Sequence, residues 1–152
     1  MRINHVSVNA SDLAVSVDFY AEIFDAVALP TPNFGFPVQW LGLGDAQVHL
    51  FEADGEPRSH HHFALTVVEL EPVYRRAAER GVFDDTAFGH HLVELPGDCA
   101  QTYLRDPAGN LLELDTPFAS RLPASLRREM KALADFRPQS EENRRARLDV
   151  GI

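Results

Sequence analysis

The stretch Ile3–Asn9, which reads Ile-Asn-His-Val-Ser-Val-Asn, recurs in outline at His62–Val67, which reads His-Phe-Ala-Leu-Thr-Val. Apolar and polar side chains alternate in both stretches, and a period of two residues is typical of a strand with one buried face. In each stretch the leading histidine falls on the more polar face. The repeat therefore predicts two similar modules, each opening with a strand that carries a histidine.

A helix is predicted after each of these strands. Ser11 is a plausible N-cap for the first helix, and Gly81 is a suitable stop for the second, which has Pro72 in its first turn. The apolar stripe of the first helix is expected to consist of residues three or four positions apart: Leu13, Val17, Tyr20 and Phe24.

Three short strands are expected to follow each helix. In the first half they cover residues 26–30, 37–43 and 46–51; in the second they cover 82–86 or 92–95, then 100–105 and 111–116. The turn at 106–110 (Asp-Pro-Ala-Gly-Asn) predicts a hairpin between the last two strands. The expected fold is α+β: two βαβββ modules that form a cupped mixed sheet with helices outside, plus a C-terminal helix.

These elements predict one domain over residues 1–118, with modules at about 1–56 and 60–118. Residues 119–152 are expected to form a helical extension, with an amphipathic helix over Pro123–Ala134 and a charged tail.

The composition excludes several classes of partner. The chain has 152 residues, of which 45% are hydrophobic, and a formal net charge of −9. An acidic surface repels phosphate backbones and anionic lipid, so neither nucleic acid nor a membrane is an expected partner. A cytoplasmic location is expected, because the chain shows no apolar signal segment and has only one cysteine, Cys99, which we expect to be inert.

Four titratable side chains share one position within their predicted strands. His5, His49, His62 and Glu113 all point away from the apolar face of the strand that carries them. A carboxylate among imidazoles is costly to desolvate, and a bound cation offsets that cost. The pattern predicts one divalent metal ion held by His5, His62 and Glu113, with His49 as a possible fourth ligand.

The other histidines have less specific interpretations. His60 and His61 precede His62 and are expected to be exposed loop residues. His90 and His91 are expected in a turn rather than in an active site.

Four segments of the chain resemble a known family. The segments 4–8, 17–20, 62–65 and 106–114 resemble the glyoxalase, bleomycin-resistance and extradiol-dioxygenase superfamily, also called vicinal oxygen chelate proteins. The resemblance covers about residues 3–116. It implies a metal-dependent enzyme that acts on a small molecule with two adjacent oxygens. The expected metal is Fe(II), with Mn, Ni, Co or Zn as alternatives.

The resemblance leaves three functions open. The first is an extradiol-like ring-cleaving dioxygenase acting on a catechol, with His49 as acid–base group and Tyr103 bonded to substrate. The second is a glyoxalase-like lyase or epimerase that stabilises an enediolate on the metal, with His49 as a ligand. The third is a binding or resistance protein without catalysis.

The same strand positions suggest the substrate pocket and the assembly. The residues expected to contact substrate are Gln47, Phe51, Gln101 and Arg105. A homodimer is also expected, because the two modules can complete a cup within one chain or with a second copy.

Overall fold

The structure is a computed structural model that describes residues 4–53, 55 and 60–148. The chain divides into two compact units: residues 1–63 with 105–111, and residues 64–104 with 112–152. Ile3, with which the first predicted strand begins, and the end of the charged tail lie outside the described residues. Each unit is described by itself.

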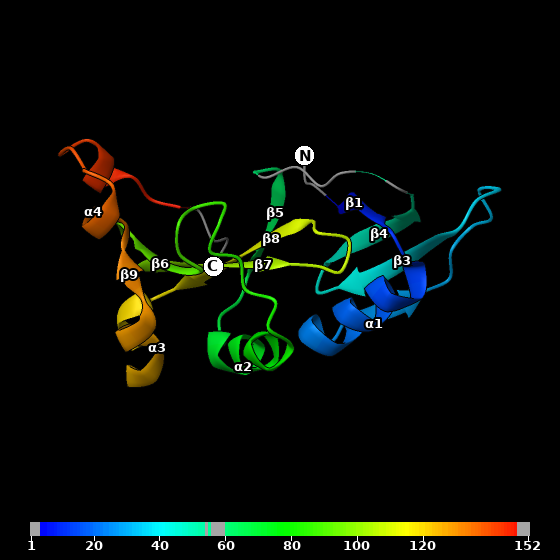
Figure 1. Cartoon of the computed structure of the whole chain (residues 1–152), viewed down its shortest axis with the longest axis horizontal. Helices are drawn as coiled ribbons and strands as arrows, with labels where there is room; N and C mark the ends of the chain where they lie inside the picture. The colour runs from blue at the N-terminus through cyan, green and yellow to red at the C-terminus, as the bar shows by residue number, and fades with distance from the viewer. Residues whose placement is uncertain (1–3, 54, 56–59, 149–152) are drawn as a thin grey trace. The chain divides into compact units, whose positions relative to one another are not determined.

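The first unit contains a four-stranded sheet with one helix. Its elements are β1 (His5–Ala10), α1 (Leu13–Phe24), β2 (Val27–Leu29), β3 (Val38–Leu43) and β4 (Ala46–Glu52), with strand order β1-β4-β3-β2. Helix α1 lies against one face of this sheet, where it contacts β3 and β4 (Figure 1). β1 pairs with β4 in parallel, and this register places His5 beside Gln47. β4 in turn pairs with β3, which places His49 beside Trp40.

Helix α1 differs in two details from the prediction. Asp12, not Ser11, is the N-cap, because its side chain accepts a hydrogen bond from the backbone N–H of Val15. The buried side chains are Ser16, Phe19, Tyr20 and Ile23. Only Tyr20 belongs to the predicted stripe; Ser16 and Ile23 each precede a predicted residue by one position. The helix is apolar on more than one side, so its periodicity alone did not identify the buried face.

The turn at 106–110 packs against this helix within the first unit. Asp106 closes the turn by accepting hydrogen bonds from the backbone N–H groups of Ala108 and Asn110. The Tyr20 hydroxyl donates a further bond to Oδ2 of Asp106, at 3.0 Å, and this contact is buried. Burial raises the pKa of Tyr20, and the charge of Asp106 raises it further, so the hydroxyl stays protonated as a donor.

Replacing Tyr20 with phenylalanine is expected to lower the free energy of unfolding by roughly 1.5–3 kcal/mol, the usual range for a bond to a charged group. The change leaves Asp106 buried with one donor fewer while preserving the ring. Urea unfolding followed by circular dichroism measures the effect. The comparison variant is Phe24→Leu, which alters a half-buried ring of the same helix without removing a polar contact. Equal stability of Tyr20→Phe and the wild type would show that the buried bond contributes nothing net.

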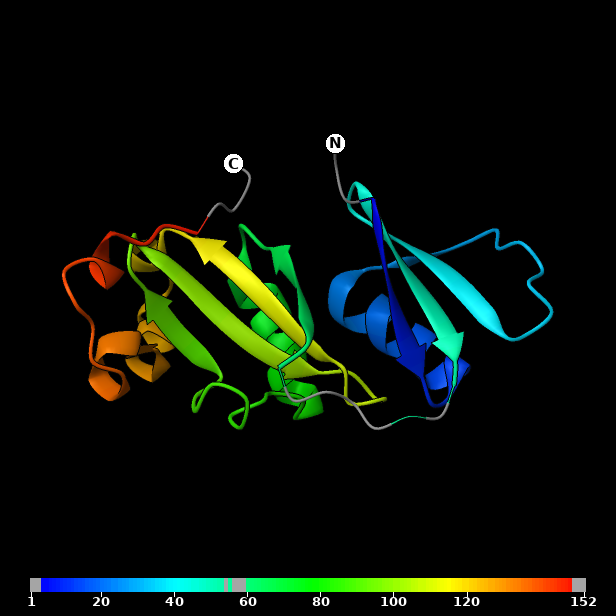
Figure 2. The same cartoon turned by 90° about the horizontal axis from the view of Figure 1, so that it is seen from above.

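The second repeat is built on a five-stranded sheet. Its elements are β5 (His62–Thr66), α2 (Leu70–Arg80), β6 (Leu92–Leu95), β7 (Cys99–Arg105) and β8 (Leu111–Pro117). With the short strand β9 (Lys131–Ala132) of the C-terminal extension, the strand order is β5-β8-β7-β6-β9. Figure 2 shows the strands of this sheet side by side, with α2 on one face. Gly81 ends α2 in the left-handed conformation, as its sequence position predicted. Of the two alternatives for the first strand after this helix, 92–95 is correct; Phe83 makes only an isolated bridge with Leu104.

The single helix predicted over Pro123–Ala134 is wrong in detail. The segment forms two short helices, α3 (Ala124–Glu129) and α4 (Leu133–Phe136), with the two-residue strand β9 (Lys131–Ala132) between them. β9 pairs in parallel with Val93 and Glu94 of β6. The edge of β6 offers unpaired backbone groups, and pairing with them outweighs continuation of the helix. Short 3₁₀ turns at Ala119–Arg121 and Asn143–Arg145 complete the described extension.

Both predicted modules are therefore present, and the fold class is α+β with helices outside the sheets. None of the helices in the described ranges is both long and apolar enough to cross a bilayer.

Candidate metal and substrate site

Two of the predicted ligands, His5 and His62, carry their protons on Nδ1. Nδ1 of His5 lies 2.6 Å from the side-chain oxygen of Asn4, and Nδ1 of His62 lies 2.8 Å from the carbonyl oxygen of His60. Both oxygens only accept hydrogen bonds, so each Nδ1 donates. Metal-binding histidines in proteins are oriented in the same way. Each of these two histidines is thus oriented as a metal ligand would be, but the described residues do not bring His5, His62 and Glu113 together as one group of ligand atoms.

His49 lies between two rings. Its ring stacks on Trp40, with centroids 4.4 Å apart and planes 7° from parallel, and on His5, at 4.2 Å and 15°. Nε2 of His49 lies 2.9 Å from the amide oxygen of Gln47, so Nε2 donates and Nδ1 keeps its lone pair. Ring lone pairs lie in the ring plane, so those of His5 and His49 lie in two nearly parallel planes.

The surroundings of His49 favour its neutral form. Burial lowers its pKa, and the charge of His5 lowers it further. The neutral imidazole can accept a proton at Nδ1 and pass it on, as a general base does.

His5 and His49 line an open pocket of about 510 Å³ in the first unit. Sequence reasoning identified Gln47 as a further lining residue but missed Phe34, Trp40 and Asp45. The indole Nε1 of Trp40 is buried, and no acceptor for its N–H is found in the described part of the chain. A buried N–H without an acceptor is costly. Trp40 was detectable from the sequence, because it lies on a predicted strand that pairs with the strand of His49.

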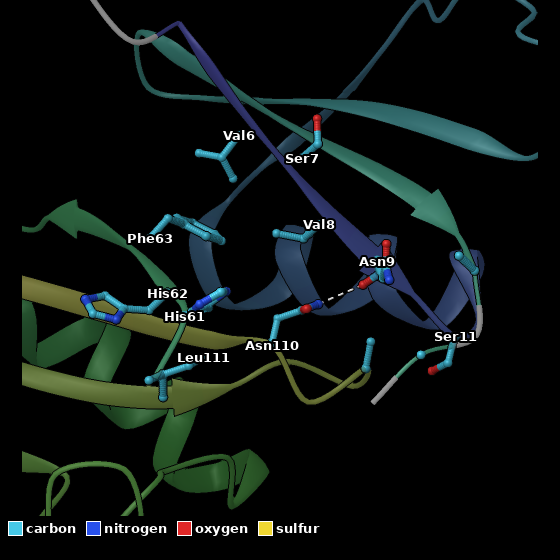
Figure 3. Close-up of a pocket in the computed structure, with 13 residues that line it drawn as sticks. Val6, Ser7, Val8, Asn9, Ser11, His61, His62, Phe63, Asn110 and Leu111 are labelled. Atoms are coloured by element: carbon cyan, nitrogen blue, oxygen red, sulfur yellow. Dashed lines mark hydrogen bonds between the residues drawn. The ribbon is translucent and has the colours of Figure 1, made fainter. Parts of the chain in front are cut away.

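His62 lines a different pocket of the first unit, of about 430 Å³ (Figure 3). Val6 and Val8 of β1 and Phe63 of β5 line it as well. At its edge the Asn110 side chain donates a hydrogen bond of 2.7 Å to the carbonyl oxygen of Asn9. Within this unit, His5 and His49 thus share a pocket that His62 does not line.

Glu113 lies in the second unit, in a connected set of buried polar groups. Nε2 of Gln101 donates to Glu113 at 2.8 Å and to Asp115 at 3.0 Å. The Tyr103 hydroxyl donates to the amide oxygen of Gln101 at 2.6 Å. Burial raises the pKa of Tyr103, and the charges of Glu113 and Asp115 raise it further, so the hydroxyl remains a donor. In this arrangement, Gln101 and Tyr103 orient Glu113.

Two further residues that were predicted to contact substrate, Arg105 and Phe51, belong to the first unit. Arg105 lies beside the hairpin turn, and Phe51 lies on β4. Arg105 donates to the carbonyl oxygen of Gly109, at 2.9 Å, across the hairpin turn. The Phe51 ring lies 5.9 Å from that of Phe36, which is half exposed. As predicted, His60 and His61 are exposed loop residues.

We expect Cys99 to be unreactive in the folded protein. Burial raises its pKa to about 11, and the nearby carboxylates of Asp115, Glu113 and Asp98 contribute to the shift. At pH 8 only about one thiol in a thousand is then the reactive thiolate, so alkylation by iodoacetamide should be at least about 100-fold slower than for a free cysteine. The rate measured on protein unfolded in urea is the control. Alkylation of the native protein at the unfolded rate would contradict the burial of this thiol.

Comparison with known proteins agrees with the fold. The sequence profile of the Glyoxalase/Bleomycin resistance protein/Dioxygenase superfamily matches residues 2–114. The chain is 29% identical to the metallothiol transferase FosB of Bacillus licheniformis over 118 residues, which are 75% of this chain and 74% of FosB.

Two solved structures are similar in fold. One is a mutant of the fosfomycin resistance protein FosX from Listeria monocytogenes, complexed with Mn(II) and 1S,2S-dihydroxypropylphosphonic acid. Its TM-score is 0.64 at 18% identity, over 83% of this chain and 95% of that one. The other is the lactoylglutathione lyase of Agrobacterium tumefaciens, with a TM-score of 0.60 at 21% identity over 80% and 97% of the two chains. This chain belongs to the glyoxalase/bleomycin resistance protein/dioxygenase superfamily.

Proposed function

We propose that this protein is a divalent-metal-dependent enzyme that binds a small substrate through two adjacent oxygens. His5, His62 and Glu113 are the proposed ligands, and His49 is the proposed proton-transfer group. The observation that carries the proposal is the orientation of the imidazoles: His5 and His62 each donate from Nδ1 to an oxygen, while His49 stacks on His5. His62 and Glu113 lie on β5 and β8, which are neighbouring strands of one sheet.

The stacking supports a role for His49 outside the metal's ligand set. Two rings 4.2 Å apart and nearly parallel do not direct their in-plane lone pairs at one ion. Three protein ligands leave three positions of an octahedral ion, two of which can take adjacent substrate oxygens.

The bound metal would act as a Lewis acid that polarises the substrate oxygens. Around it, Nδ1 of His49 accepts and returns a proton, and the stacked ring of Trp40 holds the plane of His49. Gln101 and Tyr103 keep Glu113 in position. The hydrogen bonds of the site favour the protonation states that these roles need: Nδ1 of His49 is an acceptor, and the Tyr103 hydroxyl is a donor.

Among the reactions of the superfamily, we favour a non-redox addition or isomerisation. The supporting observation is that FosB is a thiol transferase and that the similar fold from Agrobacterium tumefaciens is a lyase. In the addition of a thiol to an epoxide, an S–C bond forms, a C–O bond breaks, and the thiol proton moves to the released oxygen. His49 is the group that we propose carries that proton.

Ring-cleaving dioxygenation is the second candidate. In this candidate His5, His62 and Glu113 would hold Fe(II), which would supply the activation of O₂, and His49 would transfer substrate protons. One observation argues against this candidate. The Tyr103 hydroxyl, which is expected to bond to substrate in a ring-cleaving dioxygenase, already donates to Gln101.

One experiment separates the candidates. Metal-free protein is reconstituted anaerobically with Mn(II) or Fe(II), then given fosfomycin with a panel of thiols, the hemithioacetal of methylglyoxal and glutathione, and a panel of catechols in air. We expect metal-dependent product formation, seen by mass spectrometry, without O₂ uptake. O₂ uptake with a coloured ring-opened product would establish the second candidate. Metal binding without turnover of any substrate would favour a binding or resistance protein.

We also propose a homodimer, whose two possible pairings are distinguishable by mixing. If the N-terminal module of one copy meets the C-terminal module of the other, a heterodimer of His5→Ala and Glu113→Ala chains regains one intact site. If each chain builds its own site, both sites of that heterodimer stay defective. Metal content after unfolding and refolding the mixture, compared with each variant refolded alone, distinguishes the pairings.

A further inference from the structure

We propose that Asp85, His90 and His91 bind a transition-metal ion, with zinc as the best fit, at a second site in this protein. The three residues lie in the loop between α2 and β6, and one ligand atom of each lies within 4.8 Å of the others. They belong to the second unit and are separate in the chain from His5, His49, His62 and Glu113.

The hydrogen bonds around the two imidazoles leave a lone pair on the same atom of both rings. Nε2 of His90 lies 2.8 Å from the carbonyl oxygen of Glu129, which only accepts, so this Nε2 carries the proton. Nε2 of His91 lies 2.9 Å from the Tyr74 hydroxyl, whose own proton is donated to the Glu129 carboxylate at 2.5 Å. The hydroxyl oxygen must therefore accept from His91, and Nε2 of this ring is protonated too.

Both Nδ1 atoms consequently face the carboxylate of Asp85 with lone pairs when the rings are neutral. Nδ1 of His91 lies 2.9 Å from Oδ1 of Asp85, and Nδ1 of His90 lies 3.6 Å from the same oxygen. Two nitrogen lone pairs and a carboxylate repel one another unless a cation lies among them, either a metal ion or the proton of a hydrogen bond between His91 and Asp85. Ligand atoms of a tetrahedral zinc site lie about 3.3 Å from one another, given Zn–N bonds of about 2.0 Å, and these distances bracket that value.

The surroundings supply the outer contacts that metal sites require. The ring of His91 stacks on Phe83 at 4.5 Å, and its backbone N–H donates to Asp85 at 2.8 Å. Tyr74 belongs to α2 and Glu129 to α3, so the hydrogen bonds connect the loop to both helices. The side chains of His90 and His91 are 14% and 18% exposed, whereas that of Asp85 is 61% exposed. The ion can therefore enter from solvent, and a water can complete its tetrahedron.

The consequence of binding would be mechanical. An ion held here would fix the loop against α2 and α3, and through α3 it would fasten the C-terminal extension. Zinc is therefore expected to raise the melting temperature of the protein, because it binds the folded arrangement and not the unfolded chain.

The test uses full-length Glu113→Ala protein, in which the proposed catalytic site is impaired, with His5→Ala as a second background. Calorimetric titration of the metal-free protein with Zn²⁺ should show one site in either background. Adding Asp85→Asn, which preserves the size of the side chain, should lower the affinity by more than about 10-fold. Tyr74→Phe, which removes both the acceptor of His91 Nε2–H and the donor to Glu129, should lower it by about 10- to 100-fold.

The matched control is His60→Ala with His61→Ala, which removes two imidazoles from an exposed loop. Zinc affinity and the zinc-induced rise in melting temperature should survive in this control and be lost in Asp85→Asn. Absence of zinc binding in both backgrounds, or equal binding with and without Asp85→Asn, would overturn the proposal; the first result would mean that a proton, not a metal, lies between His91 and Asp85.

Discussion

Replacing Glu113 with alanine is expected to lower the affinity for Mn(II) by more than about 100-fold and to abolish metal-dependent turnover. Loss of an outer hydrogen bond to a ligand already costs roughly 10- to 100-fold in metal affinity, and loss of a charged ligand removes more. Glu113 is only 6% exposed, so solvent cannot replace its carboxylate without rearrangement of the strand. Calorimetric titration and metal content after dialysis measure the effect.

Two variants control this result. Gln101→Ala removes the amide that orients Glu113 and should have the smaller, roughly 10- to 100-fold effect. Glu94→Gln changes a half-buried carboxylate on β6, which β7 separates from the strand of Glu113, and should leave Mn(II) affinity unchanged. Wild-type affinity in Glu113→Ala would refute the proposed ligand set, because His5 and His62 would then suffice.

Replacing His49 with alanine is expected to reduce kcat by about 10²- to 10⁴-fold, the usual contribution of a positioned acid–base group, while metal affinity persists. The reason is geometric: the ring stacks face to face on His5 and directs Nδ1 within its own plane. Turnover in the reconstituted enzyme gives kcat, and calorimetry gives the affinity.

The control for His49→Ala is Trp40→Phe. It keeps an aromatic ring against His49 but removes the indole N–H, so it should lower kcat much less than His49→Ala does. A loss of Mn(II) affinity in His49→Ala as large as that in Glu113→Ala would identify His49 as a fourth ligand. A glyoxalase-like site with four protein ligands would then replace the proposed arrangement.

Much of the fold was predictable because it rests on periodic patterns. Alternation over His5–Asn9 and His62–Thr66 specified two strands, and both form; the face predicted to be buried is half-buried in each, and the face of the histidine is exposed. Turn residues specified the hairpin at 106–110 and the end of α2 at Gly81. The errors arose where periodicity is ambiguous or where a distant partner decides. The helix predicted over Pro123–Ala134 is interrupted because Lys131 and Ala132 pair with β6, which the local sequence does not reveal.

By itself, the sequence determined that His5, His49, His62 and Glu113 lie on strands at equivalent positions, because a strand turns alternate side chains to one face. It could not decide which ring nitrogen keeps a lone pair or whether two rings stack. Those properties depend on contacts such as Asn4 with His5, His60 with His62 and Trp40 with His49. Tertiary structure alone also turned His90 and His91, expected only as turn residues, toward Asp85. A loop has no repeating geometry from which its side-chain directions follow, so their meeting depends on the packing of the loop against α2 and α3.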